Sequence, residues 1–190
     1  MRKSYLIFRD TSKNRIKLAF LGTIFNPQGV LMAKKVNPIP EGYHTITPYL
    51  VIRNATQAIE FYKQAFDAQE TLRIPAPGNS IGHAEIKIGN SPLMLADPCP
   101  STEARSPEDL GGSPVSLLLY VENVDSFFKR AIAAGAEEVK PVKDQFYGDR
   151  CGSLKDPFGH TWHIATHKED VSEKEMRKRA EELYLTSISK

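Results

Sequence analysis

Hydrophobic and polar positions along the middle of the chain follow two periods, one typical of strands and one of helices. Between residues 56 and 66 the apolar positions recur at three- and four-residue steps: Ala58, Ile59, Tyr62, Ala65 and Phe66. Side chains at this spacing share one face of a helix. The pattern therefore predicts a helix over 56–66, with Asn54 or Thr56 as its N-cap, and with an apolar face that packs on a sheet.

Alternating or short apolar runs before and after this helix predict strands. The predicted strands are residues 45–52, 70–74, 81–88 and 93–96. Pro48 marks the first of them as an edge strand or a bulged one, because proline cannot donate to a sheet ladder. This half of the chain therefore has the order β-α-β-β-β.

A long loop over residues 97–114 follows, and the same order of elements then returns. Loops of this length in compact domains are usually functional or flexible. The predicted elements of the second half are a strand at 115–121, a helix at 123–134 ending at Gly135, and strands at 138–142, 150–154 and 161–166.

The two halves are related by an offset of 69 residues. Residues 50–54 fall on 119–123, and residues 93–96 fall on 162–165. One such unit has an apolar sheet face that it cannot bury alone, so two units are expected to pair. The predicted fold class is α+β, with two β-α-β-β-β modules, about 45–97 and 115–167, that form curved sheets around a concave cavity.

The ends of the chain lie outside this repeat. Residues 1–42 are expected to be a poorly ordered extension and linker, with a targeting segment as the alternative, because residues 1–31 hold six basic side chains against Asp10. After a domain at 43–170, a C-terminal helix is predicted at 171–190, with a capping box of Ser172 and Glu175. This helix can dock on its own domain or on a second subunit.

Composition and charge narrow the class of partner. The chain has 190 residues and a formal net charge of +2, and its excess of basic residues is confined to the first 31. The remaining body has no basic stripe with interleaved aromatics, so nucleic acid and membrane are not expected as partners. Cys99 and Cys151 give no disulfide framework, which favours a reducing cytoplasm.

Several short motifs resemble a known superfamily. The helix motif Ala58-Ile-Glu-Phe-Tyr62, the turn Asp156-Pro-Phe-Gly-His160 and the paired modules resemble the glyoxalase/bleomycin-resistance/dioxygenase (vicinal oxygen chelate) proteins. Five short segments resemble the PhnB-like branch of that superfamily: residues 48–51, 82–85, 93–97, 144–150 and 165–167. The resemblance covers about residues 45–172 and implies the fold more specifically than the reaction, because one fold hosts many chemistries.

The resemblance also implies where metal ligands would lie. Metal-using members place four His or Glu ligands on the concave sheet, and the corresponding positions here are Thr47, Met94, Ser116 and His163. Only His163 is a good ligand for a divalent ion, whereas a catalytic site normally needs about three protein ligands. We therefore expect no metal cofactor. The alternative is a divalent metal held by His163, His83 and Glu85.

Other side chains near these positions are candidates for ligand contacts. Tyr49 lies on the Thr47 face of its strand, and Trp162 lies opposite His163, so Tyr49 is expected inside the cavity and Trp162 outside. Tyr147 and Arg150 are candidates for a clamp on an acidic ligand group, with an internal Asp149–Arg150 pair as the equally weighted alternative. If this cavity is not the site, we expect it under the 97–114 loop.

The function favoured by these patterns is binding of a small organic ligand by a cytoplasmic homodimer without the usual catalytic metal. The predicted ligand-binding residues are Thr47, Tyr49, Met94, Ser116, His163, Tyr147 and Arg150. One alternative is a metal-dependent lyase, isomerase or dioxygenase of the same superfamily. A purely structural or regulatory protein is favoured only if side chains fill the cavity.

Overall fold

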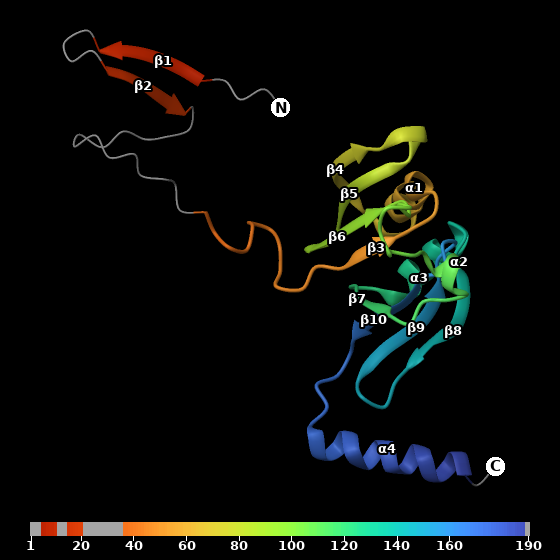
Figure 1. Cartoon of the computed structure of the whole chain (residues 1–190). Coiled ribbons are helices and arrows are strands. Elements are labelled where there is room, and N and C mark those ends of the chain that lie inside the picture. Colours follow the sequence, from red (N-terminus) through yellow and green to blue (C-terminus); the bar gives the residue numbers. More distant parts are fainter. Residues whose placement is uncertain (1–4, 11–14, 21–35, 189–190) are drawn as a thin grey trace. The chain divides into compact units, whose positions relative to one another are not determined.

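A computed structural model describes residues 5–10, 15–20 and 36–188 of the chain (Figure 1). Contacts divide the chain into two compact units, Met1–Glu41 and Gly42–Lys190. The second unit contains both predicted modules and the C-terminal helix, and it carries all the candidate residues.

The first unit contains a hairpin that the sequence analysis did not foresee. Strand β1 (Tyr5–Asp10) pairs antiparallel with β2 (Arg15–Phe20). A poorly ordered extension was expected here. The rest of residues 1–35, which includes part of the segment proposed as an alternative targeting signal, lies outside the described residues.

Module 1 forms a four-stranded sheet in the order β3-β6-β5-β4, in which β3 and β6 are parallel and the other pairs antiparallel. Its elements are β3 (Tyr49–Val51), α1 (Ala55–Phe66), β4 (Gln69–Pro75), the short 3-10 turn η1 (Pro77–Asn79), β5 (Ile81–Ile88) and β6 (Ser91–Ala96). The predicted β-α-β-β-β order is confirmed. The first strand is shorter than predicted and begins after Pro48, whose missing N–H suits a strand end.

Module 2 has the same design, with the sheet order β7-β10-β9-β8. Its elements are β7 (Ser116–Tyr120), α3 (Val124–Ala133), β8 (Glu137–Asp144), β9 (Asp149–Lys155) and β10 (Thr161–His167). A short helix α2 (Pro107–Leu110), which was not predicted, interrupts the long loop between the modules. The C-terminal helix α4 spans Glu173–Ile188.

The parallel strand pairs of the two modules have the same register. In module 1, Tyr49 lies opposite Met94 and Leu50 opposite Leu95. In module 2, Leu118 lies opposite His163 and Leu119 opposite Ile164, each 69 positions later. The offset read from the sequence therefore also relates the positions that face each other in the sheets.

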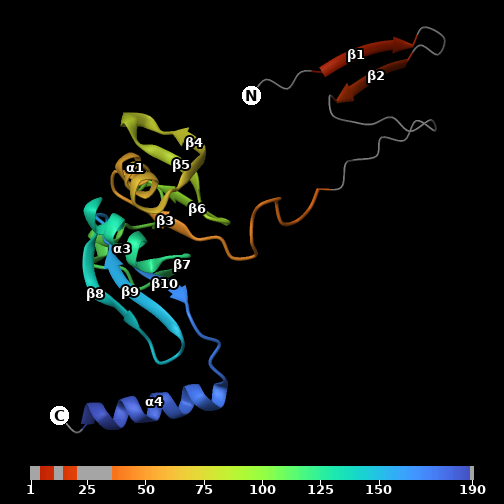
Figure 2. The same ribbon diagram turned by 180° about the vertical axis from the view of Figure 1, so that it is seen from behind.

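One face of each sheet is covered by the helices, and the apolar core lies there. Tyr62, Phe66, Ile59, Leu95 and Ile164 are among its most deeply buried members. Helices α1 and α3 contact each other where the modules meet, as both views show (Figures 1 and 2). The Arg130 side chain of α3 donates to the Ala65 carbonyl at 3.0 Å and pairs with Asp67 at 2.7 Å, which ties α3 to the end of α1.

The start of α1 is capped by a residue that is distant in sequence. Asn54 occupies the N-cap position in a left-handed conformation (φ 65°), but its side chain makes no capping bond. Instead, Asp97 accepts the backbone N–H groups of Asn54 at 2.8 Å and Ala55 at 3.1 Å. Its other oxygen accepts the N–H of Ile81 at 2.7 Å. The prediction of a local cap by Asn54 or Thr56 was wrong, because this carboxylate satisfies the free N–H groups from outside the helix.

The turn between β9 and β10 joins the two modules through a buried carboxylate. Asp156 accepts the backbone N–H groups of Phe158 at 3.0 Å and His160 at 2.9 Å. It also accepts the hydroxyl of Tyr62 from α1 at 2.7 Å and the indole N–H of Trp162 at 2.9 Å. A buried charge is tolerated when it is fully hydrogen-bonded, as it is here.

Ser172, just before the first residue of α4, caps the helix as predicted: its hydroxyl accepts the N–H of Glu175 at 3.3 Å. The Glu175 carboxylate, however, accepts Arg179 at 3.0 Å. Arg179 also donates to Glu169 at 2.8 and 2.9 Å and to the Phe146 carbonyl at 3.4 Å. The first turns of α4 are therefore attached to their own domain. Of the helices in the described part of the chain, none is long and apolar enough to cross a membrane.

Candidate functional site

Each sheet has a second face that no helix covers, and we call these the first and second open faces. Cross-strand partners share a face of a sheet. The first open face is defined by Tyr49, Val51, Leu72, Ile74, His83, Glu85 and Met94. The second is defined by Ser116, Leu118, Tyr120, Lys140, Lys143, Cys151, Ser153 and His163.

A chain of hydrogen bonds crosses the first open face. The Tyr43 hydroxyl donates to Glu85 through a short contact, and Glu85 Oε1 lies 3.2 Å from His83 Nε2. The other ring nitrogen of His83 lies 3.1 Å from the Tyr49 hydroxyl. The bond from Tyr43, followed by that from His83, lowers the pKa of Glu85. This arrangement fixes an anionic carboxylate and an imidazole next to each other, with an aromatic ring beside them.

On the second open face, His163 is held between two hydroxyl groups. Its Nδ1 lies 2.8 Å from Ser153 Oγ, and its Nε2 lies 3.1 Å from Ser116 Oγ. A neutral imidazole has one donor and one acceptor nitrogen, and a hydroxyl can serve as either partner. The Ser153 and Ser116 hydroxyls therefore fix the orientation of the ring, and each ring nitrogen faces an uncharged group. A metal ion or a ligand group would have to displace one serine to reach a ring nitrogen.

A further cluster at the end of the second open face was not predicted. The buried Asp149 accepts the Tyr120 hydroxyl at 2.7 Å and contacts His167 Nδ1 at 2.7 Å. His167 Nε2 lies 3.0 Å from the exposed Asp170. The bonds to Asp149 and then Asp170 raise the pKa of His167. Strand alternation could have indicated this cluster. His167 is four positions after His163 in β10, and Asp149 is four positions before Ser153 in β9, so the members of each pair point to the same face of the sheet.

Arg150 of the predicted Tyr147–Arg150 clamp is engaged in ion pairs within the protein, and the clamp stays a prediction. Arg150 binds both oxygens of Asp125 at 2.7 and 2.8 Å and also Asp144 at 3.2 Å. In β9 it alternates with Cys151, so it lies on the helix-covered side of the sheet, away from His163. The alternative Asp149–Arg150 pair is replaced, because Asp149 binds Tyr120 and His167. Tyr147 lies in the turn before β9, and burial, with smaller effects from Cys151 and Asp149, raises its pKa.

The four positions expected to surround one cavity fall into two sets on two separate sheets. Tyr49 and Met94 face each other on the first open face. Ser116 and His163 are hydrogen-bonded on the second. Thr47 precedes β3 and donates to the His44 carbonyl at 3.2 Å. The two sheets are not closed around a common space, and the expectation that these positions line one cavity stays a prediction. Trp162 lies in the core, opposite His163, as predicted.

The alternative metal set is likewise divided. His83 and Glu85 lie together on the first open face, whereas His163 lies on the other sheet between two serines. Across residues 36–188 and the two strands of the first unit, no group of three His, Cys, Asp or Glu side chains converges in a way that could hold a metal ion.

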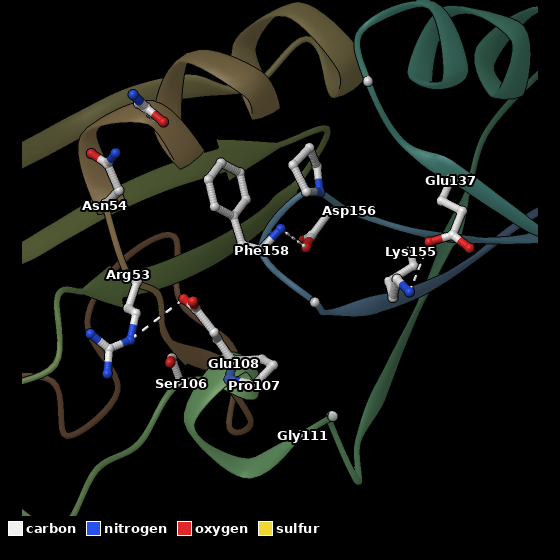
Figure 3. Close-up of a pocket in the computed structure, with 15 residues that line it drawn as sticks. Arg53, Asn54, Ser106, Pro107, Glu108, Gly111, Glu137, Lys155, Asp156 and Phe158 are labelled. Carbon is white, nitrogen blue, oxygen red and sulfur yellow. Dashed lines mark hydrogen bonds and ion pairs between the residues drawn. The ribbon is translucent and has the colours of Figure 1, made fainter.

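A cleft of about 620 Å³ lies between the start of α1 and module 2, beside residues 106–112 of the long loop, and none of the predicted ligand-binding residues lines it. It is bounded by the start of α1, the segment around α2 and the 155–159 turn (Figure 3). Its charged side chains are paired with one another: Arg53 lies 3.5 Å from Glu108, and Lys155 lies 2.8 Å from Glu137. This pairing leaves little charge to attract a ligand.

Comparison with known families and proteins gives the same fold. A profile of the Glyoxalase/Bleomycin resistance protein/Dioxygenase superfamily matches residues 43–164. An uncharacterized protein of Mycobacterium tuberculosis is 38% identical over 160 residues, which cover 83% of this chain and 91% of the relative. An uncharacterized protein of Arabidopsis thaliana is 27% identical over 123 residues, covering 61% of this chain and 74% of that protein.

Solved structures share the arrangement of strands and helices. TioX from Micromonospora sp. ML1 has a TM-score of 0.53 and 29% identity, with coverage of 64% of this chain and 97% of TioX. The PhnB protein from Bacillus cereus has a TM-score of 0.51 and 20% identity, with coverage of 65% and 99%. The second of these likenesses concerns the fold alone. With the family profile matched over both modules, the chain belongs to the glyoxalase/bleomycin resistance protein/dioxygenase superfamily.

Proposed function

We propose that the protein binds a small organic molecule on its open faces, without the metal centre used by other members of the superfamily. One observation carries this proposal. Both open faces place hydrogen-bonded polar groups beside exposed apolar side chains, with His83 and Glu85 on the first and His163 on the second. Concave, largely apolar surfaces with a few oriented polar groups are typical of ligand sites.

The donor set supports the absence of the usual metal. Thr47, Met94 and Ser116 occupy the positions of the expected ligands, and none of these side chains binds a hard divalent ion well. Ser116 is engaged with His163. The polar groups can therefore orient a ligand through hydrogen bonds, which does not require a metal.

We further propose that a second copy of the chain covers the open faces. Large apolar side chains are exposed there: Tyr49 (50%), Ile74 (49%), Leu118 (53%) and Tyr120 (57%). Patches of this kind in soluble proteins commonly mark interfaces or ligand sites. Both open faces carry mixed charge, with Glu85 and Lys87 on the first and Asp149, Lys140 and Lys143 on the second, so ion pairs can form between the faces. A homodimer that pairs unlike faces would enclose the ligand between them.

The two cysteines are free, and Cys151 is buried, which fits the reducing cytoplasm proposed as its location. Nucleic acid and membrane are not proposed as partners.

The metal-dependent lyase, isomerase or dioxygenase remains the second candidate, because His83 and Glu85, two residues that can bind a metal ion, already lie together on one face. In a homodimer, His163 of the second copy would supply the third ligand.

A ligand-observed NMR screen of an organic fragment library tests the binding proposal. Binding should weaken by roughly 1–3 kcal/mol in His163→Ala, because a buried or partly buried hydrogen bond is lost. Lys129→Ala, at an exposed position of α3, is the control and should bind as the parent does. If the fragments bind the folded His163→Ala and Tyr49→Ala variants as tightly as they bind the parent protein, the site lies on neither open face.

Two further measurements separate the remaining alternatives. Sedimentation should show a dimer that Leu118→Glu dissociates, whereas Val36→Glu in the linker should leave it intact. A monomeric parent protein would contradict the homodimer. Metal analysis of protein purified without an affinity tag should find only substoichiometric metal, and stoichiometric zinc, nickel, manganese or iron would favour the enzyme instead.

A further inference from the structure

A cavity of about 600 Å³ lies where the first open face meets the long loop. Its floor is formed by Tyr49 and Val51 of β3 and Ala96 of β6, and its rim by residues 76–82 and 97–104. The volume is within the range of about 300–1,000 Å³ that small-molecule sites usually have. The rim includes part of the 97–114 loop, which was the second place where a site was expected.

The walls of this cavity are apolar and stiff. Pro77, Pro98 and Pro100 line it together with alanines and Val51. Proline has a fixed φ, so these walls lose little conformational freedom when they contact a ligand. The Tyr49 ring adds a flat aromatic surface, and its hydroxyl is directed to His83 at 3.1 Å.

The polar groups of the lining are engaged with the protein itself. Ser80 donates to the Pro77 carbonyl at 2.8 Å, and Thr102 donates to the Cys99 carbonyl at 3.1 Å. Asp97 holds three backbone N–H groups. Among the described residues that line the cavity there is no Lys, Arg, His or Glu. An anionic ligand group would lose its hydration here without gaining a cationic partner, and the Asp97 carboxylate is already engaged with three backbone N–H groups.

We propose that this cavity binds an uncharged, apolar ring system, which would be the apolar part of the ligand whose polar part contacts the first open face. The inference rests on the proposed function and names the class of its ligand. Tyr49 connects the cavity with the first open face, because its ring lines the cavity and its hydroxyl bonds to His83 in the row of hydrogen bonds across that face. A ligand with an aromatic or alicyclic body and one polar end fits this arrangement.

Fluorescence titration with a matched pair of probes tests the proposal. N-phenylnaphthylamine is a neutral probe with a naphthalene and a phenyl ring, and anilinonaphthalene sulfonate has the same apolar body with a negative charge. The parent protein should bind the neutral probe more tightly. Ala104→Trp places an indole at the exposed rim and should weaken this binding about tenfold, a loss of about 1.4 kcal/mol. Ala133→Trp, on the exposed side of α3, is the matched control and should bind as the parent does.

Thermal unfolding of the two tryptophan variants establishes that both are folded. The inference is overturned if the neutral probe does not bind, if Ala104→Trp binds it as tightly as Ala133→Trp, or if the sulfonate binds better. Probe binding that falls as protein concentration rises would show that a second copy fills the cavity, which also overturns it. If fragments respond to His163→Ala while the neutral probe does not bind, the proposed function stands without this apolar site. Binding of neither probe nor fragments would overturn both.

Discussion

The two modules reach their last strands through turns of different chemistry. In module 1 the turn between β5 and β6 is solvent-exposed, and a Cβ added at Gly89 would meet no atom within 4 Å. In module 2 the turn between β9 and β10 contains Asp156, whose side chain is fully buried and bonds to α1 of module 1 through Tyr62. The first turn only connects two strands. The second also holds the modules together.

This difference separates the residues that identify the fold from those that can serve a ligand. Asp156 and His160 of the Asp156-Pro-Phe-Gly-His160 motif are buried in the core, and no residue of the motif belongs to either open face as defined above. The open faces, by contrast, have diverged in chemistry: Glu85 and His83 mark the first, and Lys140 and Lys143 the second. The shared design therefore lies in what the modules bury, and function depends on what they expose.

The comparison is tested most severely by Asp156→Ala. The change leaves the Tyr62 hydroxyl, the Trp162 indole and two backbone N–H groups without their acceptor. We expect a loss of roughly 3–5 kcal/mol in the free energy of unfolding, because several buried donors become unsatisfied. Urea denaturation measures it. Asn90→Ala in the module 1 turn is the control, and equal losses for the two variants would contradict the distinction.

The turn glycines sharpen the same contrast. Gly159 has φ 90°, and a Cβ there would lie 2.9 Å from Pro107 Cβ, whereas Gly89 has φ 58° and open space. Gly159→Ala should cost roughly 2–4 kcal/mol, from the left-handed conformation together with overpacking. Gly89→Ala should cost roughly 1–2 kcal/mol from the conformation alone. Thermal unfolding of both variants decides, and a cost for Gly89→Ala as high as that for Gly159→Ala would show that the clash contributes nothing.

A milder change isolates the bond between the modules. Tyr62→Phe removes one buried hydrogen bond to a carboxylate and should cost about 1.5–3 kcal/mol. Tyr120→Phe removes a bond of the same length, 2.7 Å, to Asp149 on the exposed second open face. It should cost less than about 1 kcal/mol, because the Tyr120 side chain is largely exposed and Asp149 keeps its bond to His167. If denaturant unfolding gives both variants the same loss, burial at the module boundary does not strengthen the Tyr62 bond.

The smallest expected effect is the pH dependence of the His167 contact. Asp149, and then Asp170, raises the pKa of His167 above its ordinary value of about 6.5. The contact therefore stabilises the fold fully below about pH 6.5, and this contribution is lost as pH rises through the raised pKa. NMR titration should show the pKa of His167 falling toward its ordinary value in Asp170→Asn and further in Asp149→Asn. An unchanged midpoint in both variants would exclude these carboxylates as its cause.

Periodicity alone predicted most of the fold, because the buried faces of α1 and of the strands are local patterns. It did not predict α2, although Ser106-Pro-Glu-Asp109 has the capping-box residues and the proline that favour a helix start. The cap of α1 by Asp97 was beyond local reasoning, since its partners are more than 40 positions away. The site was predicted less well. Met94 and His163, which the 69-residue offset relates, do occupy equivalent places in the two sheets, but the separation of the two open faces depends on how the sheets pack.

Asp97 has a consequence for how a ligand would be received. It caps α1, fixes the first residue of β5 and begins the loop that forms part of the rim of the apolar cavity. The near end of that rim is thus anchored to the most rigid part of module 1 before any ligand arrives. Binding then requires little ordering of the chain, so less of the gross interaction free energy is lost to conformational entropy. The same carboxylate makes the helix start and this wall of the cavity a single mechanical unit.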